Sequence, residues 1–353
     1  MAKYRIGVLY DVWWVEDEEP APPEPKSKRK AARKKEKEVH QEVYEALKEA
    51  GHNPIYSVVE GDDETLHDLA GVKADLFFNL TESYAGDDTK DMNVAAYLDL
   101  LGRRYTGAGP YGLYLAQDKA LAKKIFAFHG IHTPYFATVY RGRVDWSHDI
   151  QFPVIVKPLR EDGSIGIGFE SVVDSIKDLM EKIDAVHTEF DSEALIEEYI
   201  EGREIYVGVI GNDRPEALPL IELDLSHIPE GTPRIAGSEV KWARGTDAYE
   251  KADPFFPDDL EEAVTKRIQE TAVAAFQALK LRDYGRIDIR LAADGTPHVL
   301  EVNPNCWLSR KAEFAMAAKK AGRSYDALIA EIVDLAMARY GVTNGARIRA
   351  SEG

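Results

Sequence analysis

Short apolar runs alternate with longer mixed segments through the first third of the chain. Strands that alternate with helices form a parallel sheet with helices on its faces. We therefore predict a small doubly wound domain here, interrupted by an acidic, then proline-rich, then basic insertion at 16–38. Its predicted elements are strands at 4–12, 53–60 and 74–80 and a helix at 39–51.

The remaining two thirds mix apolar strand-like runs with amphipathic helical stretches. The predicted elements are a helix ending near Gly130 and then a strand, a strand-turn-strand unit at 152–170, a helix at 175–186, two strands at 194–210 broken at Glu201-Gly202, a helix at 257–281, a hairpin at 285–303, and two helices at 309–341 separated at Gly322.

The predicted hairpin turns at an Asp-Gly pair (294–295), which is typical of a two-residue loop. Counting outward from that loop, Asp288 faces Glu301 and Arg286 faces Asn303. The core face is then predicted to carry Ile287, Ile289, Leu291, Leu300 and Val302, with Val299 on the opposite face.

Two carboxylates directly opposite on one sheet face repel each other, so their placement needs a reason. A divalent cation such as magnesium would remove the repulsion and accept Asp288, Glu301 and Asn303 as hard oxygen ligands. Alternatively, Arg286 and Arg290 pair with the two acids on a solvated face. The hairpin alone leaves both interpretations open.

A second stretch with chemical potential is FPVIVKPLREDGSIGIG, at 152–168. Lys157 ends an apolar strand, and the turn after it holds Gly163, Ser164, Gly166 and Gly168. Glycines let backbone N–H groups close around a phosphate, and a lysine supplies a point charge. The lysine precedes the glycines, so this is not a Walker loop. An ordinary hairpin turn is the alternative.

A third stretch, LIEEYIEGREIYV, places acids around the break between two strands: Glu197, Glu198, Glu201 and Glu204. Carboxylates can accept hydrogen bonds from an adenine amino group or from ribose hydroxyls. Plain surface charge is the alternative, and on this stretch alone it is favoured.

Composition narrows the classes of function. The formal net charge of −18 argues against general affinity for nucleic acid or anionic membranes. The one cysteine, Cys306, excludes an internal disulfide and suits a reducing cytosol, so we expect a cytoplasmic protein. Cys306 could be a nucleophile, although no histidine lies near it in sequence.

These stretches occur together and in order with FFNLTES…GDD, GRRYTGAG, QDKALAKK and GRIDIR…LEVNPN. Over about residues 76–340 the chain resembles the ATP-grasp carboxylate–amine ligases, and most closely the D-alanine–D-alanine ligase family. The resemblance implies an α/β, three-domain ATP-grasp fold. Its parts would be a doubly wound amino-terminal domain at 1–117, a central α+β lid domain at 118–200, a carboxy-terminal α+β catalytic domain with the metal-binding hairpin at 201–341, and a tail at 342–353.

The resemblance also implies roles, position by position. Lys119 and Lys157 would contact nucleotide phosphates, Glu197 would hold adenine and Glu204 the ribose. The whole implied nucleotide set is Lys119, Lys157, Gly163, Ser164, Glu197, Glu198, Tyr199, Ile200 and Glu204. The implied catalytic and metal set is Lys241 near the γ-phosphate, Arg286 on the transferring phosphoryl group, and Asp288, Glu301 and Asn303 for one or two magnesium ions, which manganese can replace.

The acceptor side departs from the family pattern. The family's Pro-Gly and Ser-Leu pairs align with Cys306-Trp307 and Ala312-Glu313, and its substrate-binding His-Gly aligns with Thr81-Glu82. Losing the serine removes a donor to the second substrate's carboxylate, and Glu313 adds like charge. We therefore expect an acceptor other than D-alanine, with substrate contacts at Glu82, Trp307 and Ser309.

The resulting hypothesis is an ATP- and magnesium-dependent carboxylate–amine ligase that acts through an acyl phosphate and joins amino acids to each other, or an amino acid to a small acid. Its expected partners are small-molecule acids and amines, with no nucleic acid or membrane, and the family favours a homodimer. The alternatives are a phosphotransferase on the same fold, which needs no amine, and a non-catalytic nucleotide-binding protein.

Overall fold

The computed structural model describes residues 3–12, 38–140, 142–146, 151–161 and 163–342. Most of the predicted charged insertion at 16–38, and the tail after 342, lie outside the described residues. In the described part, every helix is too short or too polar to cross a membrane.

The amino-terminal sheet is parallel, as the alternating pattern predicts. Its strands follow the order β2-β1-β3, and β1 lies between the other two. The short helix α2 was not predicted, because it buries only Leu69 and so shows no apolar stripe. The elements are β1 (Arg5–Asp11), α1 (Val39–Glu49), β2 (Asn53–Val59), α2 (Asp63–Gly71), β3 (Leu76–Asn79), η1 (Asp88–Lys90) and α3 (Asp91–Leu100).

Two helices stand where one was predicted before Gly130. They are α4 (Pro110–Gln117) and α5 (Lys119–Phe128). Asp118 separates them, because its side chain accepts a hydrogen bond from the backbone of Leu121 at 2.9 Å and so caps the start of α5.

The central sheet has five antiparallel-paired strands in the order β5-β4-β8-β6-β7, and α6 packs against it. The prediction of a strand directly after the glycine-rich turn is wrong, because a short 3-10 helix, η2, lies there instead. The elements are β4 (Phe136–Tyr140), β5 (Arg143–Trp146), β6 (Val154–Pro158), η2 (Phe169–Ser171), β7 (Val172–Val173), α6 (Ile176–Phe190) and β8 (Ala194–Glu198).

The carboxy-terminal sheet follows the order β12-β11-β9-β13-β14, with β10 pairing to β9. The break predicted at Glu201-Gly202 is where the chain leaves β8 of the central sheet and enters β9 of this one. The elements are β9 (Gly202–Ile210), β10 (Glu216–Ala217), β11 (Ile221–Leu223), α7 (Ser238–Lys241), α8 (Asp247–Glu250), β12 (Pro254–Phe255), α9 (Glu262–Ala278), β13 (Tyr284–Ala292), β14 (Pro297–Asn303), α10 (Glu313–Lys320) and α11 (Tyr325–Arg339).

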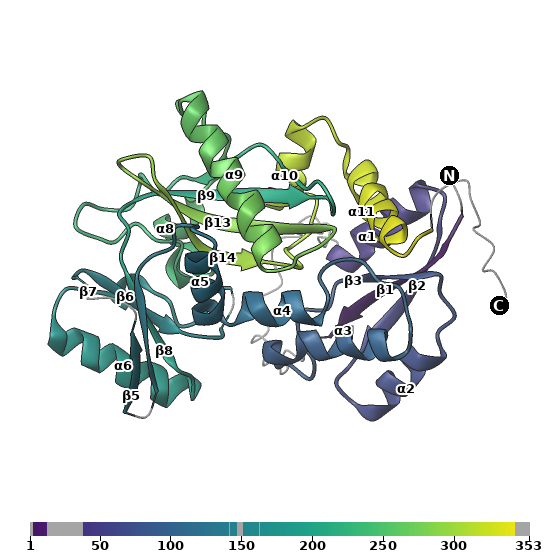
Figure 1. Cartoon of the computed structure of the whole chain (residues 1–353), viewed down its shortest axis with the longest axis horizontal. Helices are drawn as coiled ribbons and strands as arrows, with labels where there is room; N and C mark the ends of the chain where they lie inside the picture. Colours follow the sequence, from purple (N-terminus) through teal and green to yellow (C-terminus); the bar gives the residue numbers. More distant parts are fainter. Residues whose placement is uncertain (1–2, 13–37, 141, 147–150, 162, 343–353) are drawn as a thin grey trace, which may run out of the picture.

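Helices sandwich the carboxy-terminal sheet. Helix α9 covers one face, while α10 and α11 lie toward the other, where α11 packs beside α1 (Figure 1). The amino-terminal and carboxy-terminal sheets therefore share one apolar cluster, which joins Val43 of α1 to Leu328 of α11. The central sheet has its own small cluster around Val156 and Ile183, so it is the part least tied to the rest.

The predicted pairs of facing residues in the hairpin are confirmed, but the register near the turn differs from the predicted one. Near the turn, Leu291 pairs with Pro297, which is one residue out of the predicted register. A bulge at Leu300 then restores the register, so Asp288 faces Glu301. The bulge corrects the predicted faces, because Val299 is buried in the core and Leu300 is only partly buried.

Candidate functional site

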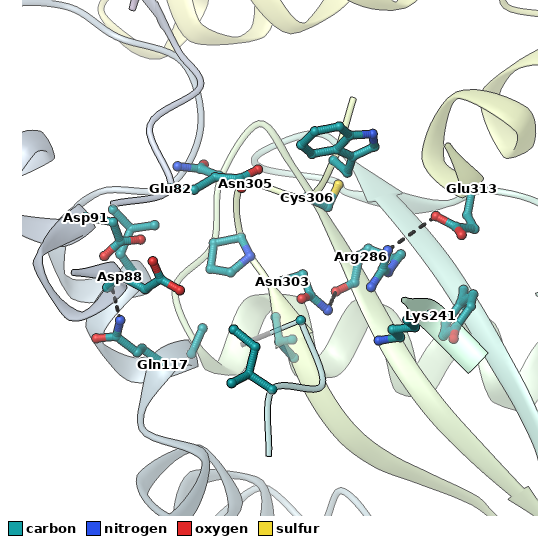
Figure 2. Close-up of a pocket in the computed structure, with 18 of the residues that line it drawn as sticks. Glu82, Asp88, Asp91, Gln117, Lys241, Arg286, Asn303, Asn305, Cys306 and Glu313 are labelled. Atoms are coloured by element: carbon teal, nitrogen blue, oxygen red, sulfur yellow. Dashed lines mark hydrogen bonds and ion pairs between the residues drawn. The ribbon is translucent and has the colours of Figure 1, made fainter. Parts of the chain in front are cut away.

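A cavity of about 610 Å³ lies between the amino-terminal domain and the carboxy-terminal sheet, beside the glycine-rich turn of the central domain. Its walls come from the amino-terminal domain, the glycine-rich turn, α7 and the hairpin. Figure 2 shows Lys241 and Arg286 on one side and the carboxylates of Glu82, Asp88 and Asp91 on the other. Two cations therefore lie at the hairpin end, with the acid Glu313 beside Arg286, and three further acids lie on the opposite wall.

The hairpin's polar face forms the floor of the cationic end. Arg286 donates two hydrogen bonds to Asp288, at 2.7 and 2.9 Å, and its guanidinium lies 4.9 Å from the ring centre of Tyr206. Burial raises the pKa of the Asp288 carboxyl, and Arg286 opposes that rise. Arg286 is thus held rigidly, with its remaining edge turned toward the cavity.

Glu301 has a different electrostatic environment from Asp288. Burial alone would raise its pKa, but the ammonium groups of Lys119, Lys241 and Lys157 outweigh burial and hold the pKa below its ordinary value. The nearest of these, Lys119 Nζ, lies 3.8 Å from the carboxylate. Glu301 therefore stays ionised at neutral pH, which a cation ligand requires.

The alternative interpretation paired Arg286 and Arg290 with the two hairpin acids. It is confirmed for Arg286 and wrong for Arg290. Arg286 pairs with Asp288, but Arg290 pairs with Glu204 on the neighbouring strand β9, at 2.8 Å. Glu204 also accepts a hydrogen bond from the hydroxyl of Tyr206 at 3.2 Å. Arg290 therefore does not pair with Glu301, whose negative charge is stabilised by the lysines instead.

The side-chain oxygen atoms of the hairpin are of the type that binds a hard divalent cation. Asp288, Glu301 and Asn303 present carboxylate and amide oxygens from facing positions of two paired strands. Within the described residues, no three His, Cys, Asp or Glu side chains are grouped so as to hold a metal ion by themselves. The remaining ligands would have to come from water and from a bound phosphate group.

Two lysines meet at one buried carboxylate on the central sheet. Glu197 of β8 forms ion pairs of 2.8 Å with both Lys157 of β6 and Lys123 of α5. Sequence reasoning found Lys119, Lys157 and Glu197 but missed Lys123. The available signal was the four-residue spacing from Lys119, which puts both lysines on one face of a helix.

The glycine-rich turn closes the cavity from the side of the central sheet. Gly163 and Ser164 both have positive φ values, of 61° and 64°, which a turn this tight requires. The Ser164 hydroxyl donates to the carbonyl of Ala236 at 2.8 Å, and the Trp242 indole donates to the carbonyl of Gly163 at 2.8 Å. These two contacts to the segment before and after α7 hold the turn over the cavity.

The other predicted nucleotide residues are Glu198, the last residue of β8, and Tyr199 and Ile200 in the link between β8 and β9. The backbone N–H of Tyr199 donates to Pro153, and its hydroxyl accepts from the backbone of Arg234 at 3.2 Å. The link thus crosses between the central and carboxy-terminal sheets.

The predicted substrate residues are divided between two cavities. A second cavity, of about 620 Å³, adjoins the first and shares Glu82, Asn305, Cys306 and Trp307 with it. Ser309 lines only the second. The Trp307 side chain is 54 % exposed and so stands at the boundary between the two.

Two features of the acceptor side bear on its chemistry. Glu313 lines the first cavity and lies 3.4 Å from Arg286, so it points into the site (Figure 2). Cys306 is buried, and burial raises the pKa of its thiol to about 12. The thiol is therefore protonated at neutral pH and unsuited to nucleophilic attack.

Of the three acids opposite the hairpin, Glu82 was predicted from the sequence, but Asp88 and Asp91 were missed. Asp88 and Asp91 lie in and just after η1, and Gln117 donates to the backbone carbonyl of Asp88 at 2.6 Å. They come from a different domain than the hairpin, so only the tertiary fold brings them to the cavity. The GDD tripeptide at 86–88 was the one available signal.

Comparison with known proteins places this geometry in a family. The family model for the D-ala D-ala ligase C-terminus matches residues 126–334. The chain is 34 % identical over 306 residues to Uncharacterized protein y4sG of Sinorhizobium fredii, covering 84 % of this chain and 87 % of that protein. It is 34 % identical over 295 residues to a D-alanine–D-alanine ligase of Bordetella petrii, covering 82 % and 84 %.

Among solved structures, the chain is similar to a D-alanine–D-alanine ligase from Bacillus anthracis in complex with ATP. The TM-score is 0.71 at 22 % identity, and the match covers 96 % of this chain and 99 % of that one. This likeness confirms the ATP-grasp fold. With the family model and the sequence relatives, it shows that the chain belongs to the D-alanine–D-alanine ligase family, whose members are ATP-grasp enzymes that form a C–N bond at the expense of ATP.

Proposed function

We propose that this protein joins a carboxylic acid to an amine, using ATP and magnesium, through an acyl-phosphate intermediate. The observation that carries the proposal is the convergence of Arg286 and Lys241 on one cavity, above the facing pair Asp288 and Glu301. Cations beside paired carboxylates suit the transfer of a phosphoryl group, whose negative charge must be stabilised.

The proposed reaction has two steps. The substrate carboxylate attacks the γ-phosphorus of ATP, which forms the acyl phosphate and releases ADP. The amine then attacks the acyl carbon, which forms the amide and releases phosphate and a proton. Arg286, fixed by Asp288 and Tyr206, would stabilise negative charge on the transferring phosphoryl group and on the tetrahedral intermediate.

The lysines would bind the triphosphate. Lys241 of α7 lines the cavity, Lys119 of α5 lies near Glu301 and Lys157 of β6 pairs with Glu197, and the turn at Gly163 and Ser164 would cover the phosphates. Magnesium, when bound at Asp288, Glu301 and Asn303, would neutralise phosphate charge. Glu197 and Glu204 would receive the adenine and ribose groups.

The acceptor is proposed to differ from D-alanine. Glu313 points at Arg286, so it places negative charge where the family holds a carboxylate. Of two basic residues that could bind that carboxylate instead, Arg310 is engaged by Asp326 at 3.0 Å and by the ring of Tyr325. Lys311 lines the second cavity. An amine without a carboxylate, or one whose carboxylate reaches Lys311, fits this arrangement.

The test measures ADP release over pools of D- and L-amino acids and simple amines, with mass spectrometry of the products. The proposal expects ADP release that needs both an acid and an amine, together with an amide product. Release of ADP with an acid or alcohol but without any amine would instead identify a phosphotransferase. Magnesium dependence is read in the same assay by chelation and by manganese replacement.

The cellular setting follows from the same resemblance. We propose a cytoplasmic enzyme that acts on small molecules and assembles as a homodimer. Light scattering coupled to gel filtration would test the assembly, with a mass twice that of the chain expected.

A further inference from the structure

Helix α5 carries a buried lysine, Lys123, to which the proposed reaction gives no role. Lys123 has no exposed surface, and lysine is almost never fully buried unless its ammonium group has a partner. Its ammonium forms an ion pair with Glu197 at 2.8 Å and donates to the hydroxyl of Thr133, also at 2.8 Å. Thr133 in turn donates to the carbonyl of Val299 at 2.8 Å, which ties this network to the hairpin strand.

Helix α5 delivers two lysines to two different ends of the site. Lys119 lies one turn before Lys123, and its ammonium approaches Glu301, at the phosphate end. Lys123 reaches Glu197 instead, on the central sheet. The four-residue spacing therefore separates a lysine suited to phosphate from one suited to a carboxylate.

Glu197 pairs with two lysines in this structure, and one of them, Lys157, is also proposed to contact a nucleotide phosphate. The carboxylate, 1 % exposed, pairs with Lys157 through one oxygen and with Lys123 through the other. When Lys157 turns to a nucleotide phosphate, one oxygen of Glu197 is released for another donor. Lys123 has no path to the phosphates, because Glu197 and Thr133 hold it in the interior.

We propose that Lys123 is a positioning residue that sets the preference for adenine over 6-oxopurine nucleotides by keeping Glu197 ionised and oriented. The inference rests on the proposed function in one respect, namely that Glu197 meets the 6-position of the purine. An ionised carboxylate only accepts hydrogen bonds, so it binds the 6-amino group of adenine and repels the 6-oxo group of hypoxanthine or guanine. A protonated carboxyl could donate to that oxo group, and the selection would be lost.

Burial explains why a partner is needed. A carboxylate in such a dry site tends to take up a proton, because burial disfavours its charged form. The two lysines outweigh burial and hold the pKa of Glu197 below its ordinary value. Burial, opposed by Glu197, lowers the pKa of Lys123 to about 8, so Lys123 still carries its charge at pH 7.

The test compares binding of ATP and ITP, each with magnesium and without other substrates, by calorimetry. Wild type should bind ATP about tenfold or more tighter than ITP, the size expected of one hydrogen bond to a charged group. Lys123→Met removes the charge and keeps the length of the side chain. It should weaken ATP binding and bring the ATP/ITP ratio to within about threefold of unity.

The matched control is Lys124→Met on the same helix. Lys124 is half exposed and pairs with Asp145, so its loss should leave the ratio unchanged. Thr133→Val is a second variant that removes a partner of Lys123 without removing the charge. It should shift the ratio in the same direction by a smaller factor, and it decides the matter if Lys123→Met fails to fold.

Several outcomes would overturn the inference. They are a folded Lys123→Met protein that keeps the wild-type ratio, equal weakening of ATP and ITP in that variant, or an unchanged ratio in Thr133→Val. A wild type without any ATP preference would overturn it as well. Failure of amide formation with an intact Lys123-dependent ratio would instead overturn the proposed ligation and leave this inference standing.

Discussion

Asp288 lies directly opposite Glu301, and this pairing exists only because β14 carries a bulge at Leu300. The turn sets Leu291 against Pro297, and a regular ladder from that pair would place Asp288 opposite Leu300 and Arg286 opposite Val302. The extra residue shifts the strand by one position. It places Glu301 opposite Asp288 and Asn303 on the wall of the cavity, while Val299 stays buried in the core.

Replacing Glu301 by Gln should abolish turnover while the fold is kept. The substitution preserves volume but removes one of the two ligand charges proposed for magnesium, so we expect a loss of at least about a hundredfold in kcat. Turnover is measured as ADP release, and the fold by circular dichroism. Glu270→Gln on the exposed face of α9 is the control. Wild-type turnover in the Glu301 variant would remove the metal assignment.

The turn at 163–168 should behave as a flap over the phosphates. Three hydrogen bonds tie it to the segment around α7, from Ser164 to Ala236, from Trp242 to Gly163 and from Ser238 to Ile167, and segments with few apolar contacts open readily. Amide hydrogen exchange in this turn should slow when magnesium and a non-hydrolysable ATP analogue are added. Exchange in α9 serves as the internal reference. Equal exchange rates with and without saturating analogue would contradict closure.

The order and type of most elements could be predicted from the sequence, because their cause is local. Strand runs such as that of β1 and helices such as α11 bury a regular set of apolar positions. The bulge at Leu300 could not be predicted, since the Asp-Gly pair favours a two-residue loop and the strand fits either register near the turn. The regular register counted from that loop nevertheless placed Asp288 opposite Glu301, because the actual loop and the bulge each shift the strand by one position and the two shifts cancel.

Asp288, Glu301 and Lys157 were singled out from the pattern of one strand or turn. Lys119 and Lys241, which lie on helices, were named only through the family resemblance. Lys123 was missed because its burial depends on Glu197 in another element, and a lysine on a helix is ordinarily solvated. Asp88 was missed for the same reason, since the cavity wall it forms requires two domains to meet.

Arg339→Met should destabilise the junction between the amino-terminal and carboxy-terminal domains. Arg339 donates to the buried carboxylate of Asp283 at 2.9 Å and to the carbonyl of Tyr105 at 2.8 Å, and Asp283 also accepts from the backbone of Gly107. Removing the arginine leaves a buried charge short of a partner. We expect the free energy of unfolding to fall by about 3 kcal/mol.

Urea denaturation measures that change. The control is Arg310→Met, because Arg310 forms an ion pair with Asp326 in which both side chains are about two-fifths exposed. Exposed pairs contribute less than about 1 kcal/mol. Equal effects of the two substitutions would show that the Asp283 junction is not a special source of stability.

Cys306 should be inert to alkylation at pH 8. Burial raises the pKa of its thiol to about 12, so the reactive thiolate is scarce there and increases only as the pH approaches that value. Iodoacetamide should leave the native enzyme active, whereas the urea-unfolded chain should be labelled rapidly, as judged by mass spectrometry. Cys306→Ala should retain most of its activity. Rapid labelling of the folded protein with loss of turnover would revive the nucleophile hypothesis.

D-alanyl-D-alanine should not be the main product, because the acceptor side lacks the family's carboxylate donor. Glu313 faces Arg286 at 3.4 Å and contributes negative charge to the cavity, which Trp307 also lines. A site that cannot pair an incoming carboxylate discriminates strongly against it. We expect kcat/KM for D-alanine at least about a hundredfold below that of the best amine found by screening.

The charge of Glu313 can be separated from its size. Glu313→Gln keeps the volume and removes the repulsion, so it should raise D-alanine use relative to a carboxylate-free amine, by about tenfold if one charged contact is at stake. Ala312→Ser, which restores the family's hydroxyl, should add to that effect. If unmodified enzyme uses D-alanine in both positions as efficiently as any other pair, the replacement of the family's acceptor residues does not set specificity. Trp307 must then move aside when substrate binds.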